Sequence, residues 1–324
     1  MSIPGADPER WLVGLDRVGW NFGLERIRRL CELLGLPQNR FSSVHVVGSN
    51  GKTSVTTAVE ALLREHGLRA GAYVSPHLNR WAERVRIGGE EIEAAAFAEA
   101  ATEVVRVIPA VERALEPGER VTQFEASTAL AFVALARAGV EAAAIEAGLG
   151  GRLDATNVIP SRVTALTSIS REHTEYLGET EEEIAAEKLD VLRSQSTLVV
   201  GDLSPAAAAV AERFAGERSA RLVRAAQVAE RVPAGVAGAY QRRNFAVALA
   251  AAEAFLGTAI DGGAADRAAQ ALRLPARLEL VGGDPPLLLD AAHNPAGVEA
   301  AVEALAEFAR GRPVVAVIAA LDVK

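Results

Sequence analysis

The chain has 324 residues, of which 50% are hydrophobic and 23% are charged, and its formal net charge is −8. This composition is typical of a globular protein with one large core or two moderate ones. The acidic balance argues against a nucleic-acid partner, because the nucleic-acid backbone is itself negative. The first twelve residues have neither a basic lead nor an apolar run, so we expect no signal peptide. Every apolar stretch is too short or too interrupted by charge to predict a membrane span.

The only cysteine, Cys31, lies in a segment whose apolar residues recur at helical spacing. A single cysteine offers neither a disulfide within the chain nor a thiolate metal cluster. We therefore interpret Cys31 as a small core residue, and we expect a cytoplasmic protein.

The first strong pattern in chain order is a strand, a loop and a helix around the stretch VHVVGSNGKTS. The β-branched run at 43–47 predicts a strand, and 53–66 predicts a helix that ends before Gly67. Gly48 and Gly51 therefore lie at a strand-to-helix junction. Exposed backbone N–H groups and the helix dipole favour an anion at such a junction.

This loop is shorter than the standard phosphate-binding loop, which needs a glycine where the chain has Val46. On its own, the short loop fits a nucleotide site and an incidental Gly/Asn turn about equally. The strand–loop–helix context favours the nucleotide site. Lys52 could then reach the terminal phosphates, and Thr53 or Ser54 could offer a hydroxyl to Mg²⁺.

Further along the chain, β-branched runs predict strands, and Ala/Leu-rich amphipathic segments predict helices between them. The predicted strands are 69–74, 163–169, 196–200, 286–290 and 313–318. The predicted helices are 92–115, 124–138, 181–194, 239–256 and 296–310. Thr180 and Glu183 form a capping box that supports the start of one helix. Strands that alternate with helices predict an α/β fold with a mostly parallel sheet.

Polar side chains at the ends of predicted strands are candidate metal ligands. Ser75 follows the strand at 69–74, and Glu146 follows an apolar run and precedes a glycine-rich loop. Because α/β folds bind ligands at the carboxyl ends of their strands, both could offer oxygens to Mg²⁺, although Ser75 also suits a plain turn cap. His173 follows another strand, and its position alone favours a surface or capping role over a metal role.

A boundary is predicted where the polar, Pro- and Gly-bearing stretch 272–286 separates a helix from a new strand. It divides the chain into a domain at 1–274 and a segment at 275–324, which is short for an independent domain. Either this segment completes the first sheet, or it is the start of a second domain that is cut short.

Several motifs together resemble the folylpolyglutamate synthase/dihydrofolate synthase branch of the Mur ligase superfamily, whose phosphate loop reads G-T-N-G-K-[GST]. The motifs are HVVGSNGKTS (45–54), YVSPHL (73–78), TQFEASTALAF (122–132), GLGGRLDATNVI (148–159), SISREHTEYLGETEEEIAAEK (168–188), YQRRN (240–244), PARLE (275–279) and LLDAAHNP (288–295). The resemblance accounts for the short loop. It implies a Mur-ligase-type phosphate-loop domain with a mostly parallel sheet. It also implies the start of a truncated, Rossmann-like C-terminal α/β domain, with 286–290 and 313–318 as its first parallel strands.

The resemblance also implies site residues. Those implied for ATP are Gly48, Asn50, Gly51, Lys52, Thr53, Ser54, Asn244, Arg277 and Asp290. Those implied for the pterin substrate are Thr122, Gln123, Phe124, Glu125, Arg152, Leu153, Asp154 and Ala155. Those implied for Mg²⁺ are Ser75, Glu146 and His173, and those implied for catalysis are Lys52, Lys188 and His293. Lys188 is expected to be carbamylated, which would turn a cation into an oxygen-rich anion; without the resemblance it reads as a solvated helix residue.

The implied activity is ATP-dependent ligation of L-glutamate to dihydropteroate, to a reduced folate, or to both, through an acyl phosphate. One alternative is a UDP-sugar-peptide ligase, suggested by Gly-Lys-Thr at 51–53 but opposed by TQFE and GLGGRLDATN. Another is a nucleotide-binding protein without ligase activity, suggested by the short C-terminus. The expected partners are small molecules, and the expected state is a monomer. Glu172 and Ala291 replace an aspartate and a glycine of the family pattern, and neither change removes a proposed ligand.

Overall fold

The computed structural model describes residues 7–15 and 23–319. Its centre is an eight-stranded sheet with the order β4-β3-β2-β5-β1-β6-β7-β8. From β2 to β8 all neighbouring strands are parallel, whereas β3 and β4 add an antiparallel edge. The strands are β1 (Ser42–Val47), β2 (Ala70–Tyr73), β3 (Val85–Ile87), β4 (Glu90–Glu91), β5 (Ala142–Glu146), β6 (Val163–Leu166), β7 (Thr197–Val200) and β8 (Arg221–Arg224).

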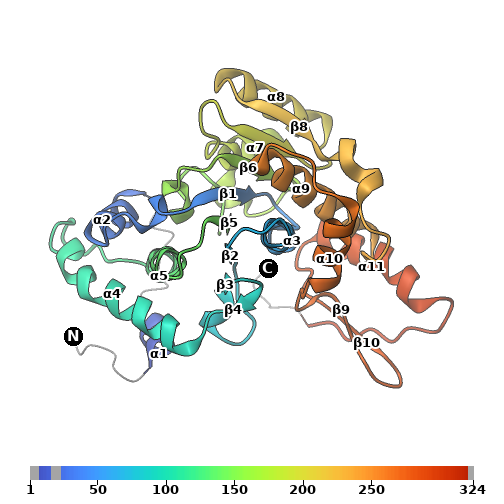
Figure 1. The fold of residues 1–324 in the computed structure, drawn as a ribbon, viewed down its shortest axis with the longest axis horizontal. Coiled ribbons are helices and arrows are strands. Elements are labelled where there is room, and N and C mark those ends of the chain that lie inside the picture. The colour runs from blue at the N-terminus through green and yellow to red at the C-terminus, as the bar shows by residue number, and fades with distance from the viewer. Residues whose placement is uncertain (1–6, 16–22, 320–324) are drawn as a thin grey trace.

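Helices cover both faces of this sheet, which stands between α5 on one side and α3 on the other in Figure 1. The helices around α5 are α1 (Pro8–Gly14), α2 (Glu25–Leu33), α4 (Ala94–Glu112) and α5 (Gln123–Arg137), continued past β6 by α6 (Thr174–Leu177), α7 (Glu181–Leu189) and α8 (Pro205–Glu217). The opposite face carries α3 (Lys52–Glu65), α9 (Ala239–Leu256) and α10 (Gly262–Ala271). Short 3₁₀ turns η1 (Pro37–Asn39), η2 (Trp81–Arg84), η3 (Ala155–Val158) and η4 (Ala225–Arg231) connect these elements.

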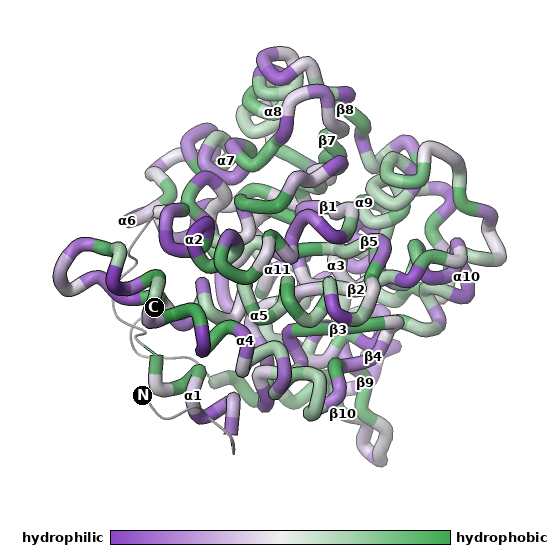
Figure 2. Tube along the Cα trace, turned by 60° about the vertical axis from the view of Figure 1, so that its left-hand side comes forward, coloured by the Kyte–Doolittle hydropathy of each residue, from purple (hydrophilic) through white to green (hydrophobic). Residues whose placement is uncertain are grey.

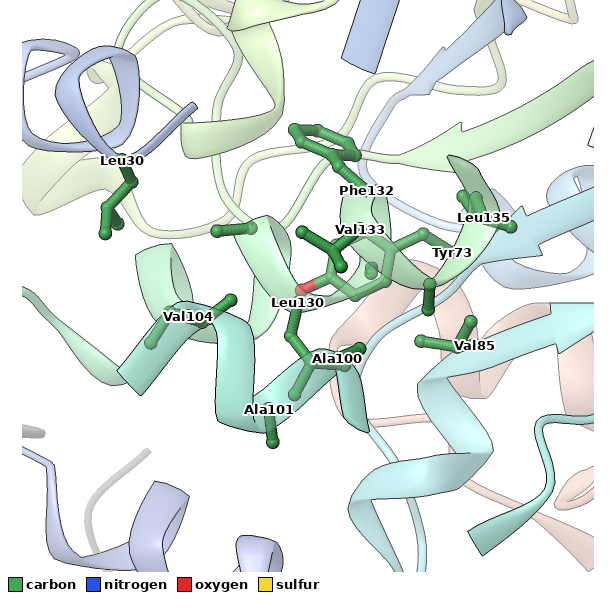
Figure 3. Packing of buried hydrophobic residues seen from close by; sticks show 14 of the residues in the cluster. Leu30, Tyr73, Val85, Ala100, Ala101, Val104, Leu130, Phe132, Val133 and Leu135 are labelled. Carbon is green, nitrogen blue, oxygen red and sulfur yellow. The ribbon is translucent and has the colours of Figure 1, made fainter. Parts of the chain in front are cut away.

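The central strands are apolar on both faces, as expected of a parallel sheet between two helical layers. Along β5, Ala143 and Ile145 pack toward α5, whereas Ala142 and Ala144 pack toward α3. Figure 3 shows the core on the α5 side, where Tyr73 lies among side chains of α4 and α5. The outer helices, such as α4, alternate hydrophobic and hydrophilic residues along the tube in Figure 2. This pattern lets each helix bury one face on the sheet and present the other to solvent.

The predicted α/β fold with a mostly parallel sheet is confirmed. Five predicted strands and six predicted helices correspond to β1, β2, β6, β7, β10, α3, α4, α5, α7, α9 and α11, and the capping box of Thr180 and Glu183 is present. The predicted helix at 181–194 is too long, since α7 ends at Leu189. Cys31 lies in the core with no exposed surface. Among the described residues, no helix is long and apolar enough to cross a membrane.

The C-terminal segment differs from the prediction. β9 (Arg277–Val281) and β10 (Leu287–Asp290) form an antiparallel pair, followed by α11 (Pro295–Ala309). The predicted strand at 313–318 is wrong, because these residues pair with no strand and Val317 is 95% exposed. A β-branched run becomes a strand only where a neighbouring strand supplies backbone partners. No described strand lies beside this run.

One buried histidine lies in the middle of the sheet. The Nε2 atom of His45 in β1 is 2.8 Å from the Oγ1 atom of Thr156, and burial, with a smaller effect of Arg193, lowers the pKa of His45 to about 3. A histidine in the unfolded chain titrates near pH 6.5. Between pH 6.5 and 3 the unfolded state therefore binds one more proton than the folded state. The stabilising effect of the neutral buried ring is lost as the pH falls through this range.

We expect the substitution His45→Gln to flatten the acid side of the stability profile. The native residue should contribute a slope of up to about 1.4 kcal/mol per pH unit between pH 6.5 and 3. Urea unfolding at a series of pH values measures this slope. His66→Gln changes an exposed histidine and should leave the profile unchanged. An equal slope in the His45 variant and the parent would show that another group dominates acid unfolding.

Candidate active site

A cavity of about 340 Å³ opens at the carboxyl ends of β1, β2, β5 and β6. It lies at the edge of the sheet where α/β folds bind ligands, and its volume is within the range of small-molecule sites. Its walls come from the loop between β1 and α3, from the residues that follow β2, β5 and β6, from α9, and from the C-terminal segment. Residues from 49 to 300 in sequence therefore meet in one place.

The loop between β1 and α3 has the geometry of a phosphate-binding loop. Gly51 has a φ of +86°, which glycine adopts without strain. A Cβ atom at Gly48 would lie 2.0 Å from the Oγ1 atom of Thr167, so only glycine fits there. Lys52 begins α3, and its Nζ atom donates to the carbonyl oxygens of Gly48 and Ser49, at 3.0 Å each. A phosphate bound at this helix N-terminus would offer the ammonium group stronger acceptors.

Glu146 ends β5 and is 1% exposed. Its Oε1 accepts from the hydroxyl of Thr53 at 3.0 Å, and its Oε2 accepts from the backbone N–H of Ser75 at 3.1 Å. Burial raises the pKa of Glu146 to about 7, against the opposing effect of Lys52. A cation beside this carboxyl group would favour its ionised form.

His173 lies on the wall of the same cavity as Glu146 and Ser75. The described residues hold no group of three or more His, Cys, Asp or Glu side chains placed to bind a metal. A cation here would thus depend on one buried carboxylate together with hydroxyl, imidazole and water ligands. Such a donor set, with few protein ligands and several waters, fits Mg²⁺.

The prediction from spacing alone that Lys188 is solvated is wrong, because the residue is only 1% exposed. Its Nζ atom donates to the carbonyl oxygen of Gly48 at 3.0 Å and to the Oε1 atom of Glu172 at 3.2 Å. Burial, and then the charge of Lys52, lower the pKa of Lys188 to about 8. Burial alone would raise the pKa of Glu172, but the two lysines outweigh it and lower this pKa. Lys188 therefore holds the backbone of the phosphate loop at Gly48.

The C-terminal segment reaches the cavity with Arg277, Asp290 and His293. The carboxylate of Asp290 accepts from the hydroxyl of Tyr240 at 2.7 Å and from the backbone N–H of Leu278 at 2.9 Å. Asp290 thus ties the β9–β10 pair to α9. Tyr240 is not among the site residues expected from the sequence, because a hydroxyl that binds an aspartate 50 positions away leaves no local pattern.

The residues expected to contact a pterin lie beside the cavity rather than in its wall. The ring of Phe124 lies under Gly148, where a Cβ atom would be 2.4 Å away. The Oδ2 atom of Asp154 accepts from the N–H groups of Gly148 and Leu149, both at 2.9 Å. Glu125 accepts from Arg26 at 2.9 Å and closes the capping box of α5. These residues shape the loop at 148–151 that borders the cavity.

Comparisons with known proteins agree with this geometry. The family model described as the Mur ligase middle domain matches residues 46–230. The dihydrofolate synthase/folylpolyglutamate synthase of Mycobacterium tuberculosis is 35% identical over 93% of this chain and 70% of its own length. A probable bifunctional folylpolyglutamate synthase/dihydropteroate synthase of Haloferax volcanii is 36% identical over 92% of this chain. The chain spans 38% of that relative's length.

Two solved structures superimpose on most of the chain. A Mycobacterium tuberculosis folylpolyglutamate synthase complexed with ADP has a TM-score of 0.84 at 32% identity, over 92% of this chain and 72% of its own. Escherichia coli FolC in complex with DHPP and ADP has a TM-score of 0.82 at 28% identity, over 98% of this chain and 77% of its own. Both structures contain a nucleotide.

Proposed function

The chain belongs to the Mur ligase family, in its folylpolyglutamate synthase/dihydrofolate synthase branch, and on this premise we propose that it uses ATP to ligate L-glutamate to a folate-type acceptor. The observation that carries the proposal is the buried carboxylate of Glu146, held by Thr53 and Ser75 beside the phosphate loop. The names and bound molecules of its relatives support the substrate class. The acceptor is dihydropteroate, a reduced folate, or both.

The chemistry begins at the acceptor's carboxylate, which is a poor electrophile. One carboxylate oxygen attacks the γ-phosphorus of ATP, ADP leaves, and an acyl phosphate forms. The amine of glutamate then attacks the acyl carbon, and the tetrahedral intermediate expels phosphate and loses a proton to give the amide. Lys52 and the loop N–H groups stabilise the negative charge on the transferring phosphoryl group. Mg²⁺, held by Ser75, Glu146 and His173, would supply further charge neutralisation.

The nucleotide would lie between the main sheet and the C-terminal segment. Asn50, Gly51 and Ser54 face it from the loop, and Asn244 from α9, where a Cβ atom at Gly51 would lie 2.3 Å from the Oδ1 atom of Asn244. Arg277 and Asp290 would face it from the other side, with His293 beside the reacting groups. The residues at 122–125 and 152–155 would contact the pterin. They would do so next to the loop at 148–151, which they shape.

We also propose that Lys188 is carbamylated. Its amine would attack CO₂ to form an N–C bond and release one proton, which requires the neutral amine. A pKa of about 8 leaves a useful neutral fraction near physiological pH. Lys52, whose charge lowers that pKa, would then stabilise the carbamate anion.

The proposed domain boundary near residue 274 lies between the end of α10 at Ala271 and the start of β9 at Arg277, where the chain leaves the main sheet. The first domain, 1–274, would hold the phosphates, and the segment 275–324 would add part of a second ligase domain. We propose a monomer in the cytoplasm, a location supported by the single, buried cysteine.

We expect the purified chain, given Mg-ATP and glutamate, to add the mass of one glutamate residue to its acceptor. Dihydropteroate and a tetrahydrofolate are tested in separate tubes, with a UDP-sugar-peptide in a third. Mass spectrometry of the products identifies the reaction and the acceptor together. A product in the third tube alone would favour the peptidoglycan-type alternative. ATP binding without any product would favour a nucleotide-binding protein without ligase activity.

A further inference from the structure

Asn294 lies where the start of α11 meets the phosphate loop, and its side chain contacts both. Its Oδ1 atom accepts from the N–H of Gly297 at 2.8 Å, which caps the helix. The same oxygen accepts from the Nδ2 atom of Asn50 at 3.2 Å. Asn50 lies 244 positions earlier in the sequence, in the middle of the loop that would hold the phosphates. The side chain therefore joins the C-terminal segment directly to that loop.

The amide of Asn294 uses its full hydrogen-bonding capacity. Its Nδ2 atom donates to the Oδ1 atom of Asn50 at 3.0 Å and to the Oε2 atom of Glu172 at 3.4 Å. With two bonds accepted and two donated, all four positions of a primary amide are engaged. A serine could cap the helix but could not complete this set, and an aspartate would replace both donors with acceptors.

The neighbours also fix which way the two amides point. A backbone N–H faces one end of the Asn294 amide, and a carboxylate faces the other, so oxygen must lie toward Gly297 and nitrogen toward Glu172. Asn50 must then present its nitrogen to the oxygen of Asn294 and its oxygen to the nitrogen. The two asparagines thus form a reciprocal pair with only one compatible orientation.

This pair belongs to a larger ring of contacts around the phosphate loop. Glu172 contacts Asn294 with one carboxylate oxygen and Lys188 with the other. Lys188 returns to the loop at the carbonyl oxygen of Gly48. The backbone of Asn50 is held separately, because its carbonyl accepts from Thr167 at 2.6 Å. The amide pair therefore fixes the side chain of a residue whose backbone is already in place.

Further along α11, two ion pairs join the helix to α9. Glu307 contacts Arg242 at 2.6 Å, and Glu303 lies 3.7 Å from Arg243. These partly exposed ion pairs are screened by solvent and hold the segment weakly. Asp290 ties the same segment to α9 through Tyr240, whereas the amide pair joins it to the phosphate loop itself.

We propose that Asn294 is a positioning residue that couples the phosphate loop to the C-terminal segment through Asn50. This inference rests on the proposed function, in which one nucleotide touches both parts. With the pair intact, Arg277 and Asp290 are already in register with Lys52 before the nucleotide arrives. Without it, binding must order the two parts as well, and this cost weakens the affinity.

The test measures the Kd of Mg-ADP by calorimetry with no acceptor present. Serine and aspartate cap helices about as well as asparagine, so both Asn294→Ser and Asn294→Asp should leave the folding of α11 intact. We expect the serine variant to bind Mg-ADP about 10-fold more weakly, and the aspartate variant more weakly still, because its carboxylate faces Glu172 and Asn50. The control Glu307→Gln loosens the other end of α11 and should change Kd less than about 2-fold.

A double-mutant cycle with Asn50→Ser separates coupling from two independent effects. If Asn294 acts through Asn50, the double variant should bind Mg-ADP no more weakly than the weaker-binding single variant. Independent effects would multiply instead, so that two 10-fold losses would give a loss of about 100-fold. Multiplied losses, or unchanged Kd values in both Asn294 variants, would overturn the proposal. The failure of the parent to glutamylate any acceptor would instead count against the proposed function, since this binding assay needs no acceptor.

Discussion

Replacing Lys52 by alanine should reduce the affinity for Mg-ATP by about 10- to 150-fold while the fold stays intact. A charge-assisted hydrogen bond contributes about 1.5–3 kcal/mol, and the ammonium group would make at least one with the phosphates. In the structure, the Nζ atom of Lys52 donates hydrogen bonds to the carbonyl oxygens of Gly48 and Ser49. Its loss therefore removes binding energy without opening the core.

Calorimetry with Mg-ATP measures the affinity, and urea unfolding measures the free energy of unfolding. Arg64→Ala is a matched control, because it removes a cation from the other end of the same helix, where the guanidinium donates to the carbonyl oxygen of Gly88. Both variants should unfold at nearly the same urea concentration as the parent, and only the Lys52 variant should lose the nucleotide. Unchanged ATP affinity in that variant would refute the assignment of the loop.

The parts of the site that follow local rules could be predicted from the sequence. The loop at 48–53 lies between a β-branched strand and an amphipathic helix, so its backbone geometry follows from neighbours in sequence. Glu146 and Ser75 end strands that run parallel, and parallel strands bring their carboxyl ends to one edge. Strand direction and strand ends are therefore enough to place these groups together.

The remaining parts depend on contacts between distant segments. Lys188 lies in a helix with three acidic residues in its first turn, a pattern typical of a solvated surface. Its burial follows from the approach of Gly48 and Glu172, which no spacing within the helix encodes. Asn294 has the pattern of an ordinary helix cap, and only the approach of Asn50 gives it a second role.

The C-terminal run at 313–318 shows the opposite case. Its β-branched residues have strong strand propensity, yet Val315 is 91% exposed and without a strand partner. Strand propensity reflects the fit to a pleated, half-buried surface more than a preference of the backbone itself. Without a neighbouring strand among the described residues, the propensity has no structure to stabilise.

Replacing Glu146 by glutamine should raise stability and lower activity at the same time. Burial raises the pKa of Glu146 to about 7, whereas a glutamate in the unfolded chain titrates near 4.3. As the pH rises from 4.5 to 7, the unfolded state loses its proton before the folded state does, so the free energy of unfolding falls across this range. Above pH 7 the ionised group destabilises the fold by its full amount. In metal-free buffer at pH 8 the variant should gain about 1–3 kcal/mol, and the gain should vanish at pH 4.5.

The same substitution should slow Mg-ATP-dependent glutamate ligation by about 100- to 1000-fold, because an amide binds a hard cation far less well than a carboxylate. Glu60→Gln is the matched control. Glu60 is also 1% exposed, but it pairs with Arg86 at 3.1 Å and lies outside the cavity. That variant changes a buried carboxylate that lies outside the cavity, so it should keep its activity. A loss of activity in the Glu146 variant but not in the Glu60 variant would show that the effect belongs to the cavity and not to the removal of a buried carboxylate in general. A loss of stability in the Glu146 variant at pH 8 would show instead that its bonds to Thr53 and Ser75 outweigh the burial of its charge.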